Sequence, residues 1–516
     1  MCIRDRFNVF SGTEVTYQAW NGVPEARING TEEELLTHFF NNSNGDYNTV
    51  QDSINLFQSG RSYNAYTYED QVDDYRQDHY QLVYALQPSD KLTLNATAHY
   101  TFGRGFFETF RFDENLARDY TRIRAFADDT EASIITDANI VTRKWLSNDF
   151  LGLVFNSEYK ANDDLLLTVG GAANTYIGDH FGNVIFVEGA ARLNATDNYY
   201  FNQSTKNDYN FYGKTEYTIG KSLNTFLDLQ YRTVTYDAEG DDADNVIVNI
   251  DATYNFFNPK FGASYAIGKG IAYASYAVAQ REPTRSDFVD ANPNGVPESE
   301  TLHDIEAGYR TNRNNFSFES NLYYQRYNNQ LVVTGALNDV GAPIRTNVDD
   351  SYRLGIELSG RYQISSSLSA KANLTLSQNK IREFEQVIAP NVIPFSNTNI
   401  ALSPSVISGG QLDYNLVNGV TVSWLSKYVG RQFLDNTSAV SRSLDPYWVN
   451  DLILNYNFKS DYINNLNIKL LVNNVLNTRY ASNGYTYSYE FNGIITENYL
   501  YPQAGINFLL GLEAAF

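Results

Sequence analysis

The C-terminal segment YPQAGINFLLGLEAAF constrains the fold most strongly, because apolar and polar residues alternate along it. Side chains of a β-strand point alternately to opposite faces, so one face of this strand is continuously apolar. The apolar face contains Ala504, Ile506, Phe508, Leu510, Leu512, Ala514 and Phe516. The opposite face contains Gln503, Gly505, Asn507, Gly511 and Glu513. Such a strand requires apolar surroundings on one side and tolerates water on the other.

The same period of two recurs along the chain, for example in residues 91–102, 222–232, 368–377 and 466–473. The mean hydropathy is −0.40, and no run of residues approaches the roughly 18 apolar residues that a membrane-spanning helix needs. A chain of this composition can therefore cross a membrane only as a closed sheet of strands. Its 40 Tyr and 31 Phe suit strands that pass through a boundary between lipid and water.

The connections between these segments alternate between short turns and long polar loops. The turns fall at residues 88–90, 161–164, 220–221, 268–270, 312–314, 365–367 and 418–419. The loops fall at residues 21–74, 103–141, 177–208, 281–301 and 431–445. This layout predicts an all-β fold, a transmembrane antiparallel up-and-down β-barrel with long extracellular loops and short periplasmic turns. We count about 18 strands, the first of them at 7–20 and running outward.

A set of about 18 strands could be a complete barrel of porin size. The long loops instead favour a larger barrel of about 22 strands around a plugged lumen, of which this chain would be the C-terminal portion. The opening residues MCIRDR have neither an apolar core nor a cleavage site, so they are no signal peptide. We interpret residues 1–6 as a non-native leader and residues 7–516 as the barrel.

The net charge of −22 argues against a nucleic-acid partner. Acidic runs such as Glu32-Glu33-Glu34 and Asp128-Asp129 are interpreted as solvated loops. The single Cys and single Met both lie within the first two residues, which excludes a disulfide framework and a thiolate metal site.

The loop at 103–129 contains the best candidate ligand-binding residues. Arg104, Arg111 and Arg122 alternate there with aromatic residues that include Tyr120. Guanidinium groups bind carboxylate or catecholate oxygens in pairs, and aromatic faces stack on the rings of a ligand. The loop also contains nearly as many acidic residues, so self-paired charges on a solvated loop are the alternative.

Three further candidates lie near the ends of predicted strands. Arg281 and Arg285 follow a strand at its outer end, where they either contact a ligand or anchor the loop. Among the tryptophans, Trp20 is the best candidate for stacking on a ligand, whereas Trp145, Trp424 and Trp448 suit an interfacial girdle.

No constellation for catalysis or metal binding stands out. The five histidines have neither HxxxH nor HExxH spacing, and no nucleophile accompanies a base. His99 with distant serines does not make the catalytic set that a barrel enzyme needs at one rim. We therefore predict that the protein is not an enzyme and has no cofactor and no metal site.

Several segments resemble TonB-dependent outer-membrane receptors, especially iron-complex receptors of Bacteroidetes type. They are TYQAWNGVPE at 16–25, QREPTRSDF at 280–288 with HDIEAGY at 303–309, KYVGRQFLDNT at 427–437, NNVLNTRY at 473–480, and the final YPQAGINFLLGLEAAF. Together they span nearly all of the chain, and the two C-terminal segments are the most specific. The family places a plug domain and a TonB box before the barrel, and this chain contains neither.

The resemblance implies energy-coupled uptake of a ferric siderophore or similar iron complex across the outer membrane of a Gram-negative bacterium. It also implies a monomer that contacts lipopolysaccharide or other outer-membrane lipid, the barrel assembly machinery, and the TonB complex through the missing plug. The terminal Phe516 resembles the assembly signal of the family. Alternative ligands are cobalamin, haem or an oligosaccharide, and a plugless diffusion porin is the alternative function.

Overall fold

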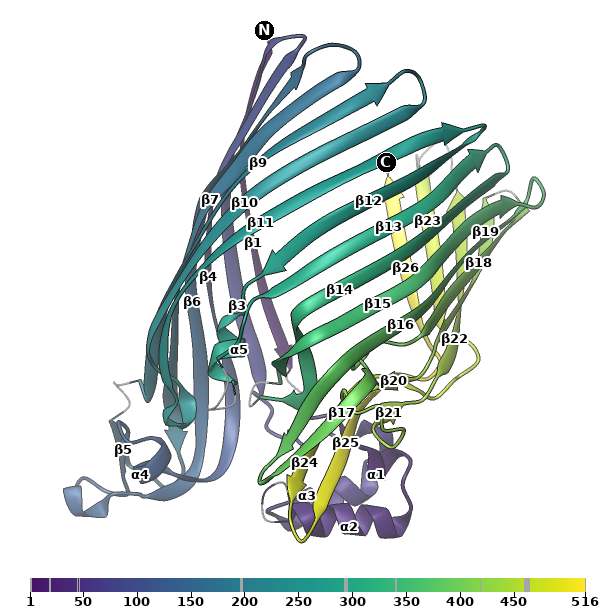
Figure 1. Ribbon diagram of the computed structural model, residues 1–516. Coiled ribbons are helices and arrows are strands. Elements are labelled where there is room, and N and C mark those ends of the chain that lie inside the picture. The colour runs from purple at the N-terminus through teal and green to yellow at the C-terminus, as the bar shows by residue number, and fades with distance from the viewer. Residues whose placement is uncertain are drawn as a thin grey trace.

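Antiparallel pairing between neighbouring strands builds the wall of the molecule (Figure 1). The computed structural model describes residues 2–17, 20–43, 45, 47–194, 198–291, 296–338, 341–417, 419–458 and 465–515. The described residues form a sheet of 19 strands, in which β17 (Asn391–Asn399) pairs only with β16. The other strands form the wall, in agreement with the predicted count of about 18.

Each strand of the wall pairs with the next along the chain, which makes the topology up-and-down. The wall strands are β1 (Cys2–Tyr17), β3 (Val72–Ser89), β4 (Leu92–Asn115), β6 (Asp137–Lys160), β7 (Leu165–Val187), β9 (Tyr200–Ile219), β10 (Leu223–Asp241), β11 (Ile247–Ile267), β12 (Gly270–Arg281), β13 (Glu300–Arg313), β14 (Phe316–Leu337), β15 (Pro343–Gln363), β16 (Leu368–Ile388), β18 (Val406–Val417), β19 (Val420–Val429), β22 (Tyr447–Phe458), β23 (Asn465–Asn473) and β26 (Asn507–Ala515).

The alternation in the sequence separates the two faces of this wall. Leu151 and Leu153 of β6 are exposed on the outer face, as are Phe508 and Leu510 of β26. The intervening positions face the lumen, where the ring of His99 contacts the Asn174 side chain at 3.1 Å. The apolar face is therefore the outer face, as the period of two predicted.

The two ends of the barrel differ in their connections. Short turns and both termini lie at one end, and the helices and long loops lie at the other, which we call the loop end (Figure 1). Gly220 and Gly268 occupy turns with φ of +65° and +60°, a conformation that residues with a Cβ rarely adopt. The predicted placement of short turns at one end and long loops at the other is confirmed, whereas residue 418 of the predicted turn 418–419 lies outside the described residues.

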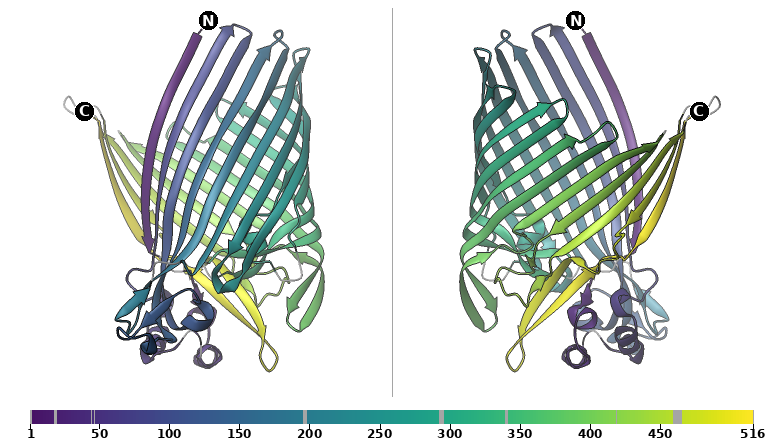
Figure 2. Two further views of the ribbon diagram at one scale, coloured as in Figure 1. Left: turned by 90° about the vertical axis from the view of Figure 1, so that its left-hand side faces the viewer. Right: turned by 90° about the vertical axis from the view of Figure 1, so that its right-hand side faces the viewer.

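The strands β1 and β26 are the edges of the sheet. β1 pairs with β3 from Cys2 opposite Gln87 onwards, so residues 2–6 continue the first strand. β26 pairs with β23, and no pairing joins β1 to β26 within the described residues. Figure 2 shows the two edge strands diverging towards the end that holds the termini.

Several wall strands extend beyond the predicted loop boundaries. β4 continues to Asn115 and β6 begins at Asp137, although we assigned 103–141 to a loop. Likewise β7 reaches Val187 and β9 begins at Tyr200 within the predicted loop 177–208. Each of β4, β6 and β7 is much longer than the roughly 9–11 residues that cross a bilayer, so these strands project from the membrane at the loop end.

The loop end contains the short elements of the structure. They are β2 (Val23–Pro24), α1 (Glu25–Ile28), α2 (Glu32–Asn42), α3 (Val50–Gln58), η1 (Gly60–Ser62), α4 (Leu116–Asp119), β5 (Arg124–Phe126), η2 (Glu131–Ser133), β8 (Arg192–Asn194), η3 (Ala243–Asn245), α5 (Arg285–Val289), β20 (Gln432–Phe433), β21 (Ser443–Leu444), β24 (Ala481–Glu490) and β25 (Ile494–Pro502). No helix in the described ranges is long and apolar enough to cross a membrane.

The acidic run Glu32-Glu33-Glu34 forms the first turn of α2 and is not an irregular loop. Thr31 accepts a hydrogen bond from the backbone N–H of Glu34, and the Glu34 carboxylate accepts one from the backbone N–H of Thr31. This reciprocal capping satisfies two amide groups at the helix start, and negative charge is favourable there. The backbone and side-chain hydrogen bonds from Thr31 lower the pKa of Glu34.

A buried polar cluster joins the first loop to the last hairpin across the edges of the sheet. Nδ1 of His38 lies 3.0 Å from Oε2 of Glu497, and Nε2 of His38 contacts the Tyr47 hydroxyl at 2.6 Å. Asn42 donates to both carboxylate oxygens of Glu497, at 2.8 and 2.9 Å. β2 also pairs with β25. We call this junction of residues 23–47 with residues 481–502 the loop clamp.

Candidate functional site

A cavity of about 540 Å³ opens in the barrel interior at the loop end, and we call it the mouth cavity. Its walls come from β1, β3, β4, β6, β7 and β9, and α5 closes one side. Tyr75, Phe107 and Tyr200 contribute aromatic rings from the lumen face, and Lys144 and Arg285 contribute cations. Aromatic rings beside cationic donors suit a ligand that has both rings and oxygen acceptors.

The segment from Glu282 to Asp290, which includes α5, is held against the barrel wall by buried ion pairs. The Glu282 carboxylate accepts hydrogen bonds from Arg232 at 2.8 and 3.0 Å, and it lies 2.6 Å from Nζ of Lys206. Arg232 also lies 2.7 Å from Asp208. Burial raises the pKa of Glu282, but hydrogen bonds from Arg232 and Lys206 outweigh it and lower that pKa to about 2.

Further contacts orient α5 beside the mouth cavity. Arg285 forms an ion pair with Asp242 and donates to Oδ1 of Asn202 at 3.0 Å. The side chain of Asp287 is buried, accepts from Thr284 at the helix start, and lies 3.5 Å from Nη1 of Arg345. α5 is therefore bound to the strands on both sides of it, and the cation of Arg285 has a fixed position.

The mouth cavity has carboxylates of its own beside these cations. Glu14, Asp73, Asp242 and Asp290 belong to its lining together with Lys144 and Arg285. Carboxylates outnumber these two cations in the lining, so the cavity does not present a strongly positive field.

Two of the seven residues predicted to bind a ligand lie at the mouth cavity. Arg285 lines it directly. Trp20 packs edge-on against the ring of Phe107, with the ring centroids 5.0 Å apart, and its carbonyl accepts from the Tyr501 hydroxyl.

Arg104 lies on the outer face of β4. It is the register partner of Arg76, and its guanidinium lies 5.1 Å from the centroid of the Trp145 ring. Trp145 packs there against Phe106 and Phe181, and both Trp145 and Phe106 also belong to the lining of the mouth cavity, so the girdle role of Trp145 stays a prediction.

The remaining predicted ligand residues have partners within the protein. Arg111 lies 3.8 Å from Glu114, Arg122 lies 3.0 Å from Asp241, and Arg281 lies 3.0 Å from Glu300. The ring of Tyr120 is buried in a hydrophobic cluster and packs on Tyr199 at 4.9 Å. Their roles in ligand binding stay predictions, and Phe516 lies outside the described residues.

Sequence reasoning missed the lumen-facing residues Tyr75, Lys144, His180 and Tyr200 of the mouth cavity. Each is a single polar or aromatic position in a different strand, and the register of the neighbouring strands β3, β4, β6, β7 and β9 places these positions side by side. Among the described residues, no group of three or more His, Cys, Asp or Glu side chains has the geometry to hold a metal ion.

Several solved structures share this architecture, and three of them are described below. The ferric-catecholate import receptor Fiu from E. coli K12 matches with a TM-score of 0.67 and 16% identity over 98% of this chain. The siderophore receptor PiuA from Acinetobacter baumannii matches with a TM-score of 0.61 and 14% identity over 86% of this chain. The ferric yersiniabactin uptake receptor FyuA from Yersinia pestis matches with a TM-score of 0.58 and 12% identity over 86% of this chain. At these identities the likeness establishes the fold.

This chain spans only part of those proteins: 71% of Fiu, 64% of PiuA and 61% of FyuA. No curated protein matches the sequence. The family model of the TonB dependent receptor-like beta-barrel matches residues 19–475. The chain therefore belongs to the TonB-dependent receptor beta-barrel family, whose members are transporters of the outer membrane and not enzymes.

Proposed function

We propose that this protein is the barrel of a receptor that takes up a ferric siderophore or a similar iron complex in an energy-coupled way. The observation that carries the proposal is the mouth cavity, where Tyr75 and Phe107 present rings near Arg285 at the loop end. An iron chelate with aromatic or catecholate arms has ring faces for such stacking and oxygen atoms for the cations.

The names of similar proteins support the same class of ligand. Fiu is described as a ferric-catecholate import receptor, and FyuA as a ferric yersiniabactin uptake receptor. Energy coupling would come through the TonB complex, as in the family to which the chain belongs. We also propose that the protein is a monomer that contacts outer-membrane lipid, including lipopolysaccharide, and that the barrel assembly machinery inserts it.

The test is uptake of radioactive iron by the native bacterium with and without the gene. We expect deletion to abolish the energy-dependent part of uptake for at least one ferric complex in a panel of catecholate, phenolate and citrate chelates. A protonophore should lower uptake by the parent strain to the level of the deletion strain, while uptake of an unrelated nutrient that does not need the gene is equal in both strains. Equal iron uptake by both strains for every chelate would contradict the proposal.

A further inference from the structure

Three cationic side chains gather on the outer face of the barrel wall, where β14, β15 and β16 run side by side (Figure 1). They are Arg326 of β14 and Lys380 and Arg382 of β16. Arg326 follows the exposed Leu322 at an even spacing, and Lys380 follows the exposed Leu376 in the same way. Alternation along the strands therefore places these side chains on the outer face.

The register of the sheet aligns these side chains across three strands. Arg326 is the partner of Tyr352 in β15, and Tyr352 is the partner of Lys380 in β16. Asp350 of β15 lies beside this row and forms ion pairs with Arg326 at 3.3 Å and with Arg382 at 3.1 Å. One carboxylate thus holds two arginines together. We call the three cations and Asp350 the outer basic patch.

The outer basic patch has an excess of positive charge, because three cations surround one carboxylate. The guanidinium groups are well exposed, with 50% exposure for the side chain of Arg326 and 58% for that of Arg382. Lys380 forms no ion pair within the described ranges, and its ammonium donates to the backbone carbonyl of Asn397 at 3.3 Å. In a chain with a net charge of −22, such a surface is a specific feature.

The outer basic patch lies at the height where the wall leaves the membrane on the side of the loop end. β14 begins at Phe316, beside a short turn. About ten residues lead from Phe316 to Arg326, and a tilted strand crosses a bilayer with roughly 9–11 residues. The patch therefore stands at the level of the lipid headgroups.

The surface on the turn side of the patch is apolar. Leu322, Leu354 and Leu376 are exposed there on the outer face. The rings of Tyr324 and Tyr352 lie beside them, with centroids 6.3 Å apart, as in the aromatic girdle of a membrane barrel. Cations, aromatic rings and aliphatic side chains thus follow one another along the strands, in the order of the headgroup, interface and acyl chains of a lipid.

Phosphate groups fit the cations of the patch. A guanidinium group binds two phosphate oxygens in parallel, and an ammonium group adds a point charge. A lipid that carries phosphate also has acyl chains to lie against the exposed leucines, whereas a free phosphate ion would use the cations alone. The combination of charge and apolar surface therefore favours a lipid as the occupant.

We propose that the outer basic patch binds the phosphate-bearing headgroup of an anionic lipid in the outer leaflet, with the acyl chains against the leucines on its turn side. The inference names the site of the lipid contact proposed above and rests on that contact. It does not depend on the iron complex, because no residue of the patch lines the mouth cavity. The patch is also on the opposite face of the wall from the lumen, so it is independent of what the lumen contains.

The probe is diphosphorylated lipid A, titrated into the purified full chain in neutral detergent and followed by native mass spectrometry, which counts the bound lipid molecules. We expect saturable binding that weakens as salt is raised, because the contacts are ionic. Dephosphorylated lipid A, which has the same acyl chains, should bind at least about tenfold more weakly. Inorganic phosphate alone should not bind saturably.

Two variants test the residues of the patch. Arg326→Gln with Arg382→Gln should bind diphosphorylated lipid A at least about tenfold more weakly than the parent. Lys380→Gln should bind it about threefold more weakly. The second variant leaves Asp350 paired with both arginines, so its fold does not depend on the substitution.

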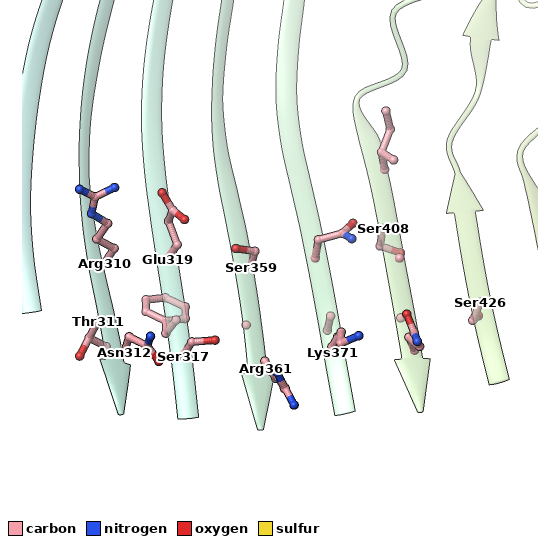
Figure 3. Close-up of a pocket in the computed structure, with 18 of the residues that line it drawn as sticks. Arg310, Thr311, Asn312, Ser317, Glu319, Ser359, Arg361, Lys371, Ser408 and Ser426 are labelled. Atoms are coloured by element: carbon pink, nitrogen blue, oxygen red, sulfur yellow. The ribbon is translucent and has the colours of Figure 1, made fainter. Parts of the chain in front are cut away.

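The matched control is Arg310→Gln with Arg361→Gln, which removes two arginines from the lumen face. Figure 3 shows both side chains in a cavity of about 920 Å³ on the lumen wall. The change in net charge equals that of Arg326→Gln with Arg382→Gln, but the outer face is untouched. The control should bind diphosphorylated lipid A like the parent.

The inference is overturned if the control variant loses as much affinity as Arg326→Gln with Arg382→Gln, or if Lys380→Gln binds like the parent. It is also overturned if inorganic phosphate binds as tightly as the lipid. Equal binding of the two forms of lipid A would overturn the phosphate site and leave the proposed lipid contact standing. If neither form binds the parent, both the inference and the proposed lipid contact fail.

Discussion

Two hydrogen bonds, of 2.8 and 3.0 Å, join the guanidinium of Arg232 in the barrel wall to the carboxylate of Glu282 at the start of the segment that contains α5. Lys206 supplies a second cation to the same carboxylate at 2.6 Å. This buried contact fixes where the chain leaves the wall after β12, and so it determines where Arg285 stands in the mouth cavity.

Replacing Glu282 by Gln should destabilise the barrel by about 3 kcal/mol, because Arg232 and Lys206 would lose a buried counter-charge. Urea unfolding of the purified protein measures the change. Glu131→Gln is the control, since Glu131 pairs with Arg192 but its side chain is 71% exposed; we expect less than about 1 kcal/mol there. Equal effects of the two substitutions would contradict the account of the Glu282 contact.

Acid should weaken the same contact over a defined range of pH. The pKa of Glu282 is lowered to about 2 from an ordinary value of 4.5, so its ionised form stabilises the folded state. That stabilisation is fully present above the ordinary pKa and is lost as the pH falls towards about 2. Stability measured as a function of pH should therefore fall less steeply over this range in Glu282→Gln than in the parent. If the plots of stability against pH for the variant and the parent run parallel, Glu282 does not contribute to the pH dependence of stability.

The loop clamp should open when Glu497 is replaced by Gln. Burial raises the pKa of Glu497, but contacts with His38 and Asn42 outweigh it and lower that pKa, so the ionised carboxylate is the stabilising form. Hydrogen exchange in α2 and β25 should become at least about tenfold faster in the variant. Glu490→Gln, at the exposed tip of the same hairpin, should leave exchange in α2 unchanged. If hydrogen exchange in α2 is equally fast in the Glu497→Gln and Glu490→Gln variants, the loop clamp does not depend on Glu497.

Arg285→Ala should weaken ligand binding at the mouth cavity at least about tenfold, whereas Arg281→Ala should change it little. Arg285 lines the cavity and neutralises Asp242, so its removal leaves a carboxylate facing an anionic chelate. Arg281 lies outside the cavity lining and pairs with Glu300. The measurement is the affinity of each variant for one ferric complex. A larger loss of affinity in Arg281→Ala than in Arg285→Ala would contradict the assignment of Arg285 to the ligand site.

The architecture could be predicted from the sequence because successive residues of each strand alternate between the apolar outer face and the polar lumen face. A slip of one residue in β26 would turn the exposed apolar side chains of Phe508 and Leu510 into the lumen, so alternation alone was enough to find this strand. The projecting ends of β4 and β6 were missed, because water surrounds both faces above the membrane and the alternation weakens there. The helix α2 was missed although Thr31 and Glu34 form a capping pair that the sequence displays.

The candidate site was less predictable than the fold. Arg285 was found because it lies in a recognisable segment at the end of a strand. Tyr75, Phe107 and Tyr200 were not assigned to a common site, because they come from separate strands and only the register between those strands places them side by side. Arg104 was predicted to bind a ligand because it is an arginine in a loop-end segment. Side chains of a strand alternate between the two faces, and this alternation places Arg104 on the outer face of β4, away from the lumen.

The most direct test of the account is quenching of tryptophan fluorescence by ferric complexes in the purified protein. Trp20 packs on Phe107 at the mouth cavity, whereas Trp424 lies on the outer face of β19, opposite the exposed Leu412, and does not line the cavity. We predict saturable quenching by at least one ferric catecholate, phenolate or citrate complex, which Trp20→Phe lowers and Trp424→Phe retains. No saturable quenching with any complex, or quenching that depends on Trp424 and not on Trp20, would contradict binding at the mouth cavity.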